Sequence, residues 1–165
     1  MRIGIDVGVE PGFHGGIATA VGSLIAALGK LTDGSEEYSI IVNPYLSTDW
    51  LLPLAANQKF EVRPKHPARG FVRRTLSPLS SRVRRWLSPP RTWPEVPVSN
   101  GFHESLNCDV MHFPTQHSFT LCAIPCIYNP HDLQHLHYPQ FFSPADLAIR
   151  ETIYPAGCHL ARTVI

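Results

Sequence analysis

Short apolar runs alternate with helical patterns along this chain, and that alternation constrains its fold more than any other feature. The chain opens with an apolar run over residues 2–7, a loop that contains four glycines, and apolar residues spaced three and four apart over 17–31. This order predicts a buried strand, a tight loop and an amphipathic helix. Further strands are predicted over residues 38–42, 60–63, 109–113, 124–128 and from 163 onward. The chain is therefore expected to be α/β, with a mostly parallel, doubly wound sheet.

Residues 64–101 interrupt this rhythm, because proline and serine are abundant there. Nine of the 14 lysines and arginines lie between Arg63 and Arg91, although the net charge of the whole chain is only +1. A neutral total excludes a general polycation, so nucleic acid is not an expected partner. We predict an insertion that contains a helix from Ser77-Pro78 to about Leu87, and a further short helix at about residues 48–56.

The basic insertion could form one apolar face flanked by cations. A cationic amphipathic helix of this kind suits the interface of an anionic membrane. The alternative is a solvated loop whose apolar residues pack on protein. The membrane-facing candidates are Arg73, Arg74, Arg82, Arg84, Arg85 and Trp86.

The last third of the chain predicts a long helix that begins at Ser143-Pro144 and continues towards Arg162. Pro155 lies inside it and is expected to kink it or split it in two. No secretion signal precedes the first strand, and the four cysteines form no C-x-x-C pair. We therefore expect reduced structural thiols in a cytoplasmic protein.

Two segments could carry chemistry. The first is the loop with Gly12-x-x-Gly15-Gly16, which is neither a dinucleotide-binding fingerprint nor a P-loop. Its glycines fit either a tight turn that needs positive φ or a site where backbone N–H groups hold a phosphate.

The second segment, Asn129 to Pro139, follows a predicted parallel strand, where open α/β sheets place their ligands. Its polar residues are His131, Asp132, His135 and His137. They fit either a ligand-contacting loop or a histidine-rich capping turn, and their spacing does not favour a metal site. His112 and His117, which follow another strand, are expected to be satisfied by local hydrogen bonds.

Five motifs together resemble family 4 (group 1) retaining glycosyltransferases. In chain order they are Arg2-Ile-Gly-Ile-Asp6, Gly15-Gly16-Ile17, Asp109-Val-Met-His-Phe-Pro114, Pro130-His-Asp-Leu133, and Ala156-Gly-Cys-His-Leu-Ala-Arg162 before Val164-Ile165. The resemblance covers nearly the whole chain except residues 64–101. It implies that residues 1–165 form the Rossmann-like three-layer, acceptor-side N-terminal domain of a GT-B fold, truncated before the C-terminal donor domain.

The resemblance also implies site residues and ligands. Gly15, Gly16 and Asp132 would bind the donor diphosphate or the acceptor, and His131 would lie at the reacting sugar as the catalytic candidate. The donor would be a nucleotide-sugar and the acceptor a carbohydrate or a lipid-linked glycan, with no metal or other cofactor. The protein would be cytoplasmic and peripheral to the inner face of the membrane. The family's E-x7-E pair is missing from this sequence, so the chain alone is expected to be inactive.

A different class of function stays open. The chain could be a non-catalytic Rossmann-like module that binds a nucleotide or a membrane surface. The absent G-x-G-x-x-G fingerprint disfavours a dinucleotide, and Asp6 lies too early for the ribose-binding acid of such domains.

Overall fold

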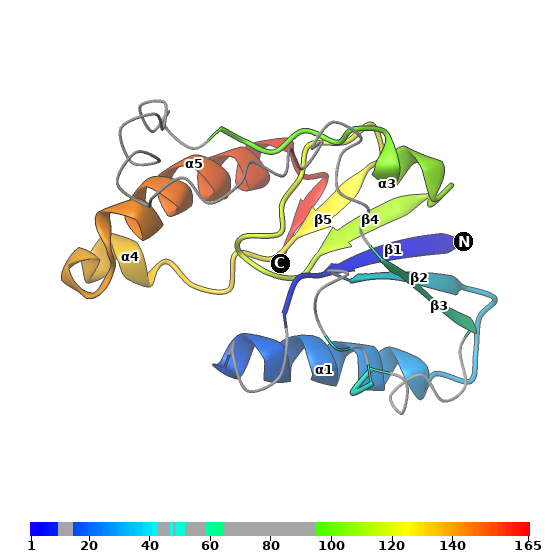
Figure 1. Cartoon of the computed structure of the whole chain (residues 1–165). Coiled ribbons are helices and arrows are strands. Elements are labelled where there is room, and N and C mark those ends of the chain that lie inside the picture. The colour runs from blue at the N-terminus through cyan, green and yellow to red at the C-terminus, as the bar shows by residue number, and fades with distance from the viewer. Residues whose placement is uncertain (10–14, 43–46, 48, 52–58, 65–94) are drawn as a thin grey trace, which may run out of the picture.

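The computed structural model describes residues 1–9, 15–42, 47, 49–51, 59–64 and 95–165. Its described elements are strands and helices in a mixed order, in which β2 is followed by β3 and β4 by β5 (Figure 1). They are β1 (Arg2–Val7), α1 (Gly15–Gly29), β2 (Glu37–Val42), β3 (Lys59–Pro64), α3 (Phe102–Ser105), β4 (Val110–Phe113), β5 (Cys126–Tyr128), α4 (Gln134–His137), the 3-10 helix η2 (Pro139–Phe141), α5 (Pro144–Leu160) and β6 (Thr163–Val164).

The strands form one six-stranded sheet in the order β3-β2-β1-β4-β5-β6. Every pairing in it is parallel, which confirms the predicted α/β fold with a parallel sheet. Helix α1 lies on one face of the sheet and α5 on the other (Figure 1). Because consecutive strands run outward from β1 in one direction and from β4 in the other, the strand order reverses between β1 and β4.

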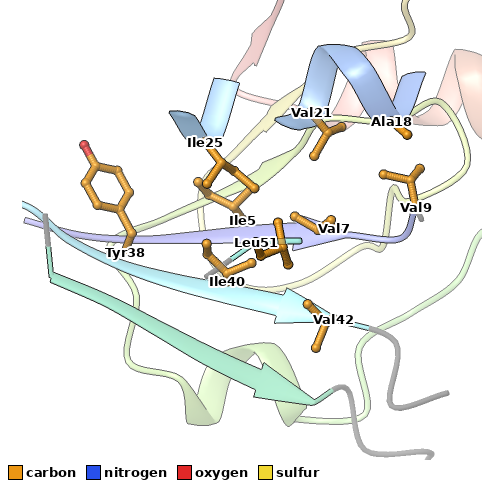
Figure 2. Close-up of a cluster of buried hydrophobic side chains, with 10 residues drawn as sticks. All are labelled: Ile5, Val7, Val9, Ala18, Val21, Ile25, Tyr38, Ile40, Val42 and Leu51. Carbon is orange, nitrogen blue, oxygen red and sulfur yellow. The ribbon is translucent and has the colours of Figure 1, made fainter. Parts of the chain in front are cut away.

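The face of the sheet towards α1 carries the first half of the core. Alternate residues of β1 and β2, among them Ile5, Val7 and Ile40, are almost fully buried there against Val21 and Ile25 of α1 (Figure 2). Both faces of a parallel sheet are covered, so its strands are apolar on both sides rather than alternating with polar residues. That is why β2 reads as the continuous run Tyr-Ser-Ile-Ile-Val.

The opposite face packs Phe113, Phe119 and Tyr128 with residues of α5 such as Ile153. Helix α5 begins as predicted, with Ser143 capping it through a reciprocal bond with Asp146. Pro155 was expected to kink this helix or to split it in two; the split is wrong, because α5 runs unbroken through Pro155, and the kink stays a prediction. A proline removes one N–H donor, and the buried residues on either side hold the helix to the sheet.

Several predictions fall outside the described residues. These are the helix of residues 77–87, most of the insertion of residues 64–101, and all six membrane-facing candidates. Of the short helix at residues 48–56 only 49–51 are described, and they form a turn. Residues 95–101 are described, and Val98 forms an isolated bridge with Leu121. Within the described part of the chain, no helix is long and apolar enough to cross a membrane.

Gly157 of α5 permits a close approach to the ring of Tyr128. A Cβ added at Gly157 would lie 2.5 Å from Tyr128 Cε1. We expect Gly157→Ala to lower the free energy of unfolding by about 1–3 kcal/mol, because the rigid ring cannot give way in a packed core. Urea denaturation measures this. The neighbouring exchange Cys158→Ala, at an exposed position, is the control and is expected to stay within about 0.5 kcal/mol.

Candidate functional site

The candidate site lies at the carboxyl edge of the sheet around the reversal of strand order. Open α/β sheets bind ligands in the crevice at such a reversal. Gly15 and Gly16 open α1 after β1, and His131 and Asp132 follow β5, with β4 between these two strands. All four residues are exposed. The described contacts do not join the two glycines to His131 or Asp132; both pairs belong to the same edge of the sheet.

The start of α1 leaves its first backbone N–H groups without partners inside the helix, as every α-helix does. Gly15 has a positive φ of 50°, and no heavy atom of a described residue lies within 4 Å of a Cβ added at Gly15 or Gly16. The positive φ at Gly15 is the tight-turn feature that the sequence pattern anticipated. No described residue therefore fills the space beside the Cα atoms of Gly15 and Gly16.

His131 is held in an unusual backbone conformation. Its φ is 62°, its N–H donates to Asn129 Oδ1 at 2.9 Å, and its Nε2 lies 2.6 Å from the carbonyl oxygen of Pro114. A carbonyl can only accept, so Nε2 carries a proton and Nδ1 is the ring nitrogen left to act on a ligand. A positive φ in a residue other than glycine is strained, and such strain concentrates at functional sites.

His112 of β4 lies near this histidine. Its Nε2 atom is buried and has no hydrogen-bond partner among the described residues, so the expectation that local hydrogen bonds satisfy His112 is wrong. Burial lowers the pKa of His112, and the nearby His131 lowers it further. His112 is therefore neutral at pH 7.

Asp132 belongs to a second polar cluster, between the loop after β5 and helix α5. Its Oδ1 accepts from the N–H of Gln134 at 3.0 Å and lies 3.6 Å from Nη1 of Arg150. Nη1 also donates to the Tyr154 hydroxyl at 2.7 Å, and the guanidinium lies over the Phe142 ring. Burial raises the pKa of Tyr154 to about 12, so this hydroxyl stays protonated.

Two histidines border the same cluster. His117 is exposed and its ring lies beside Tyr154, whereas His135 is buried against Tyr154 and Phe142. Burial lowers the pKa of each, and the positive charge of Arg150 lowers it further. Both imidazoles are therefore neutral at pH 7, and each offers one N–H donor. His137, the last of the predicted group, is exposed at the end of α4.

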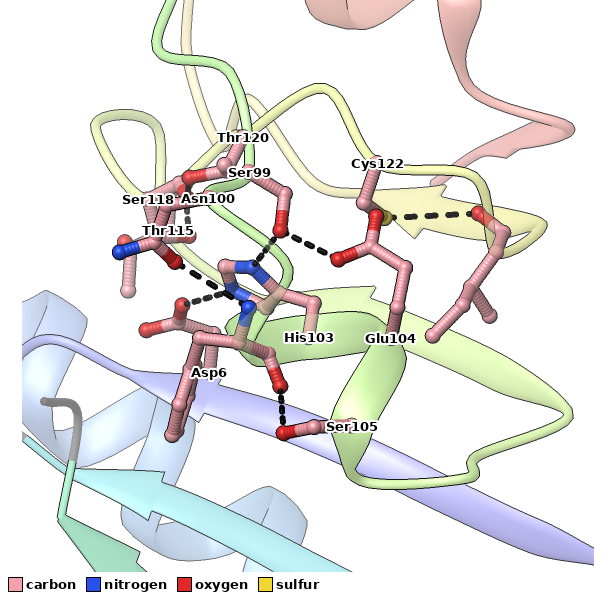
Figure 3. Close-up of polar contacts among 12 residues, drawn as sticks. Asp6, Ser99, Asn100, His103, Glu104, Ser105, Thr115, Ser118, Thr120 and Cys122 are labelled. Atoms are coloured by element: carbon pink, nitrogen blue, oxygen red, sulfur yellow. Dashed lines mark hydrogen bonds and ion pairs between the residues drawn. The ribbon is translucent and has the colours of Figure 1, made fainter. Parts of the chain in front are cut away.

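A third polar network joins β1 to α3, and its members Asp6 and His103 are buried while Ser99 and Glu104 are half-buried (Figure 3). Nε2 of His103 lies 3.3 Å from Asp6 Oδ2, and its Nδ1 lies 3.2 Å from Ser99 Oγ. Ser99 Oγ donates to Glu104 at 2.6 Å, and that bond chiefly lowers the pKa of the Glu104 carboxyl. Ser99 Oγ therefore links the Glu104 carboxylate to the His103 ring. The network anchors α3 to the sheet.

The sequence interpretation overlooked Arg150, Tyr154 and His103. A signal for the first two was present, because Arg150 shares a helical stripe with Ile153, Tyr154 and Gly157, all of which are buried. An arginine on an apolar stripe indicates a buried cation that needs partners. No comparable pattern marks His103, which lies in a helix of only four residues.

Comparisons of the chain with protein-family models, with curated proteins and with solved structures find no match. The described residues also contain no group of three or more His, Cys, Asp or Glu that could hold a metal ion.

Proposed function

We propose that this chain is the acceptor-side domain of a GT-B-fold retaining glycosyltransferase, which transfers a sugar from a nucleotide-sugar to an acceptor. One observation carries the proposal. The glycine-led helix α1 and the strained His131 follow β1 and β5 at the same edge of a parallel sheet whose strand order reverses between β1 and β4. The five motifs that resemble family 4 transferases occur along the same elements.

The chemistry of sugar transfer fits these groups. When the bond between the anomeric carbon and the diphosphate breaks, its electron pair stays on the diphosphate oxygen. Backbone N–H groups at the start of α1 would suit that growing negative charge, because the helix holds them in place before the reaction begins. His131 would contact the reacting sugar through Nδ1, because Nε2 is bonded to Pro114. The acceptor, a carbohydrate or a lipid-linked glycan, would lie on the same side.

The sequence contains no pair of glutamates in the E-x7-E spacing that holds the donor in the family. A complete active site therefore requires residues beyond these 165. The chain itself is expected to show no turnover and to bind the diphosphate part of the donor weakly.

Gly16→Ala tests whether Gly16 contacts the donor diphosphate. A glycine with only a structural role and a glycine that contacts the diphosphate predict different effects on pyrophosphate affinity. Alanine is a better helix former, and its Cβ meets open space, so the melting temperature should rise by the equivalent of up to about 1 kcal/mol. The added methyl would nevertheless stand where the diphosphate approaches. We expect binding of inorganic pyrophosphate, measured by NMR titration, to weaken at least about threefold, the effect of losing one modest contact.

Ser23→Ala is the matched control, because Ser23 is an exposed residue further along α1. It should also stabilise the helix but leave pyrophosphate binding unchanged. If Gly16→Ala and the original protein bind pyrophosphate with equal affinity, α1 is not part of the donor site.

A further inference from the structure

We infer that Arg150 binds a phosphate-type oxyanion through the edge of its guanidinium formed by Nε and Nη2, beside His117 and His135. The polar contacts of Arg150 with described residues all use Nη1, which faces Tyr154 and Asp132. Nε is buried and has no partner among those residues. Nε and Nη2 lie on the same side of the guanidinium, and their two parallel N–H groups match two oxygens of a phosphate or carboxylate.

Two buried nitrogen atoms at Arg150 and the neighbouring His135 lack hydrogen-bond partners among the described residues, and an oxyanion could bond to them. Arg150 is only 8% exposed, and the one anionic contact that the described residues give it is Asp132 at 3.6 Å, a carboxylate that is itself 46% exposed. Nδ1 of the buried His135 also has no hydrogen-bond partner in the described structure. Buried donors without acceptors are destabilising, so two unsatisfied polar side chains beside one another indicate a missing partner.

The charges around Arg150 do not exclude an anion, but they do not create a strongly positive electrostatic potential that would attract one. His117 and His135 are neutral at pH 7, so Arg150 is the only full positive charge that the described structure places in this cluster. Asp132, Asp146 and Glu151 lie close enough to influence the two histidines. Recognition must therefore come from direct contact with the guanidinium edge, and Asp132 must compete with the incoming anion.

The site is next to the proposed acceptor side, since Asp132 directly follows His131. If the proposed transferase function holds, on which this step alone rests, the oxyanion belongs to the acceptor. The acceptor class would then be a phosphorylated sugar or a phosphate-linked lipid glycan rather than a neutral sugar. Oxyanion binding itself does not require the transferase function.

The test is a titration of the 165-residue chain with inorganic phosphate at constant ionic strength, followed through the imidazole NMR signals of His117 and His135. We expect saturable shifts of both signals, and a pKa of His117 that rises when phosphate is bound, since an anion favours its charged form against Arg150. Pyrophosphate binding at Gly16 would not move these signals, so failure here and failure of the proposed function are distinguishable. Shifts no larger than those caused by chloride would overturn the inference.

Two variants sharpen the result without removing a buried charge. Arg150→Lys keeps the cation but lacks the two-pronged edge, and should weaken phosphate binding at least about fivefold. Arg162→Lys, at an exposed position after the same helix, is the matched control and should change nothing. Asp132→Asn can keep the bond from Gln134 N–H but removes the competing charge, and should strengthen binding about two- to fivefold. Equal affinities in Arg150→Lys, Asp132→Asn and the original chain would contradict the site.

Two further probes identify the source of the phosphate. A soluble sugar phosphate and vesicles that contain phosphatidic acid are each added in place of inorganic phosphate. Displacement of the His117 signal by the sugar phosphate alone supports a soluble phosphorylated ligand, and displacement by vesicles alone supports a lipid headgroup. A response to neither probe would count against a phosphate ester as the ligand.

Discussion

His103→Leu is expected to lower the free energy of unfolding by about 3 kcal/mol, because the buried Asp6 carboxyl group would lose the imidazole that it faces. His103 is 2% exposed and Asp6 3%, so water cannot replace the lost imidazole. The substitution removes both ring nitrogens, of which Nε2 faces Asp6 Oδ2 and Nδ1 faces Ser99 Oγ. Chemical denaturation followed by circular dichroism measures the loss. His159→Leu, at an exposed position in the last turn of α5, should cost less than about 1 kcal/mol.

A double-mutant cycle separates the pair from the packing around it. With Asp6→Leu already in place, His103→Leu should cost markedly less than it does in the original chain, because the carboxylate it faces is gone. Additive losses would mean that the two side chains act independently, and that Phe113 packing against the His103 ring accounts for the effect.

The strands and the two long helices were predictable because the burial of apolar side chains largely determines where they form. Each strand of a covered parallel sheet must be apolar on both faces, and runs such as Tyr38 to Val42 show this directly in the sequence. The apolar stripe of Val21, Ile25 and Leu28 predicted α1. The pair Ser143-Pro144 predicted the start of α5. Boundaries differ by a few residues, because the ends of elements depend on turns and caps rather than on burial.

The polar part of the candidate site was less predictable, because its contacts join residues far apart in the chain. Asp6 meets His103, 97 positions away, and Pro114 meets His131 across 17 positions. Neither contact produces a periodic pattern in the amino-acid sequence. The short elements α3, α4 and η2 were missed for a related reason: helices of three or four residues are too short to show a stripe, and tertiary contacts decide them.

His131→Ala should reduce turnover by about a hundredfold in the complete transferase that the proposed function requires, a typical cost of losing one preorganised polar group at a reacting centre. The substitution removes the imidazole that is proposed to contact the sugar. Its Nδ1 atom would make that contact, because Nε2 is bonded to the carbonyl oxygen of Pro114. Initial rates with a nucleotide-sugar donor measure the effect. Folding should change by no more than about 1 kcal/mol, since the side chain is exposed and contributes one hydrogen bond to the protein.

The backbone of His131 supplies the control for this experiment. At a φ of 62°, glycine is unstrained and asparagine is tolerated better than most residues, so His131→Gly and His131→Asn preserve the loop while removing the imidazole. Both should lose turnover as His131→Ala does, whereas His137→Ala, an exposed histidine in α4, should not. If His131→Gly retains full turnover, the imidazole has no part in transfer, and His131 serves only to shape the turn after β5.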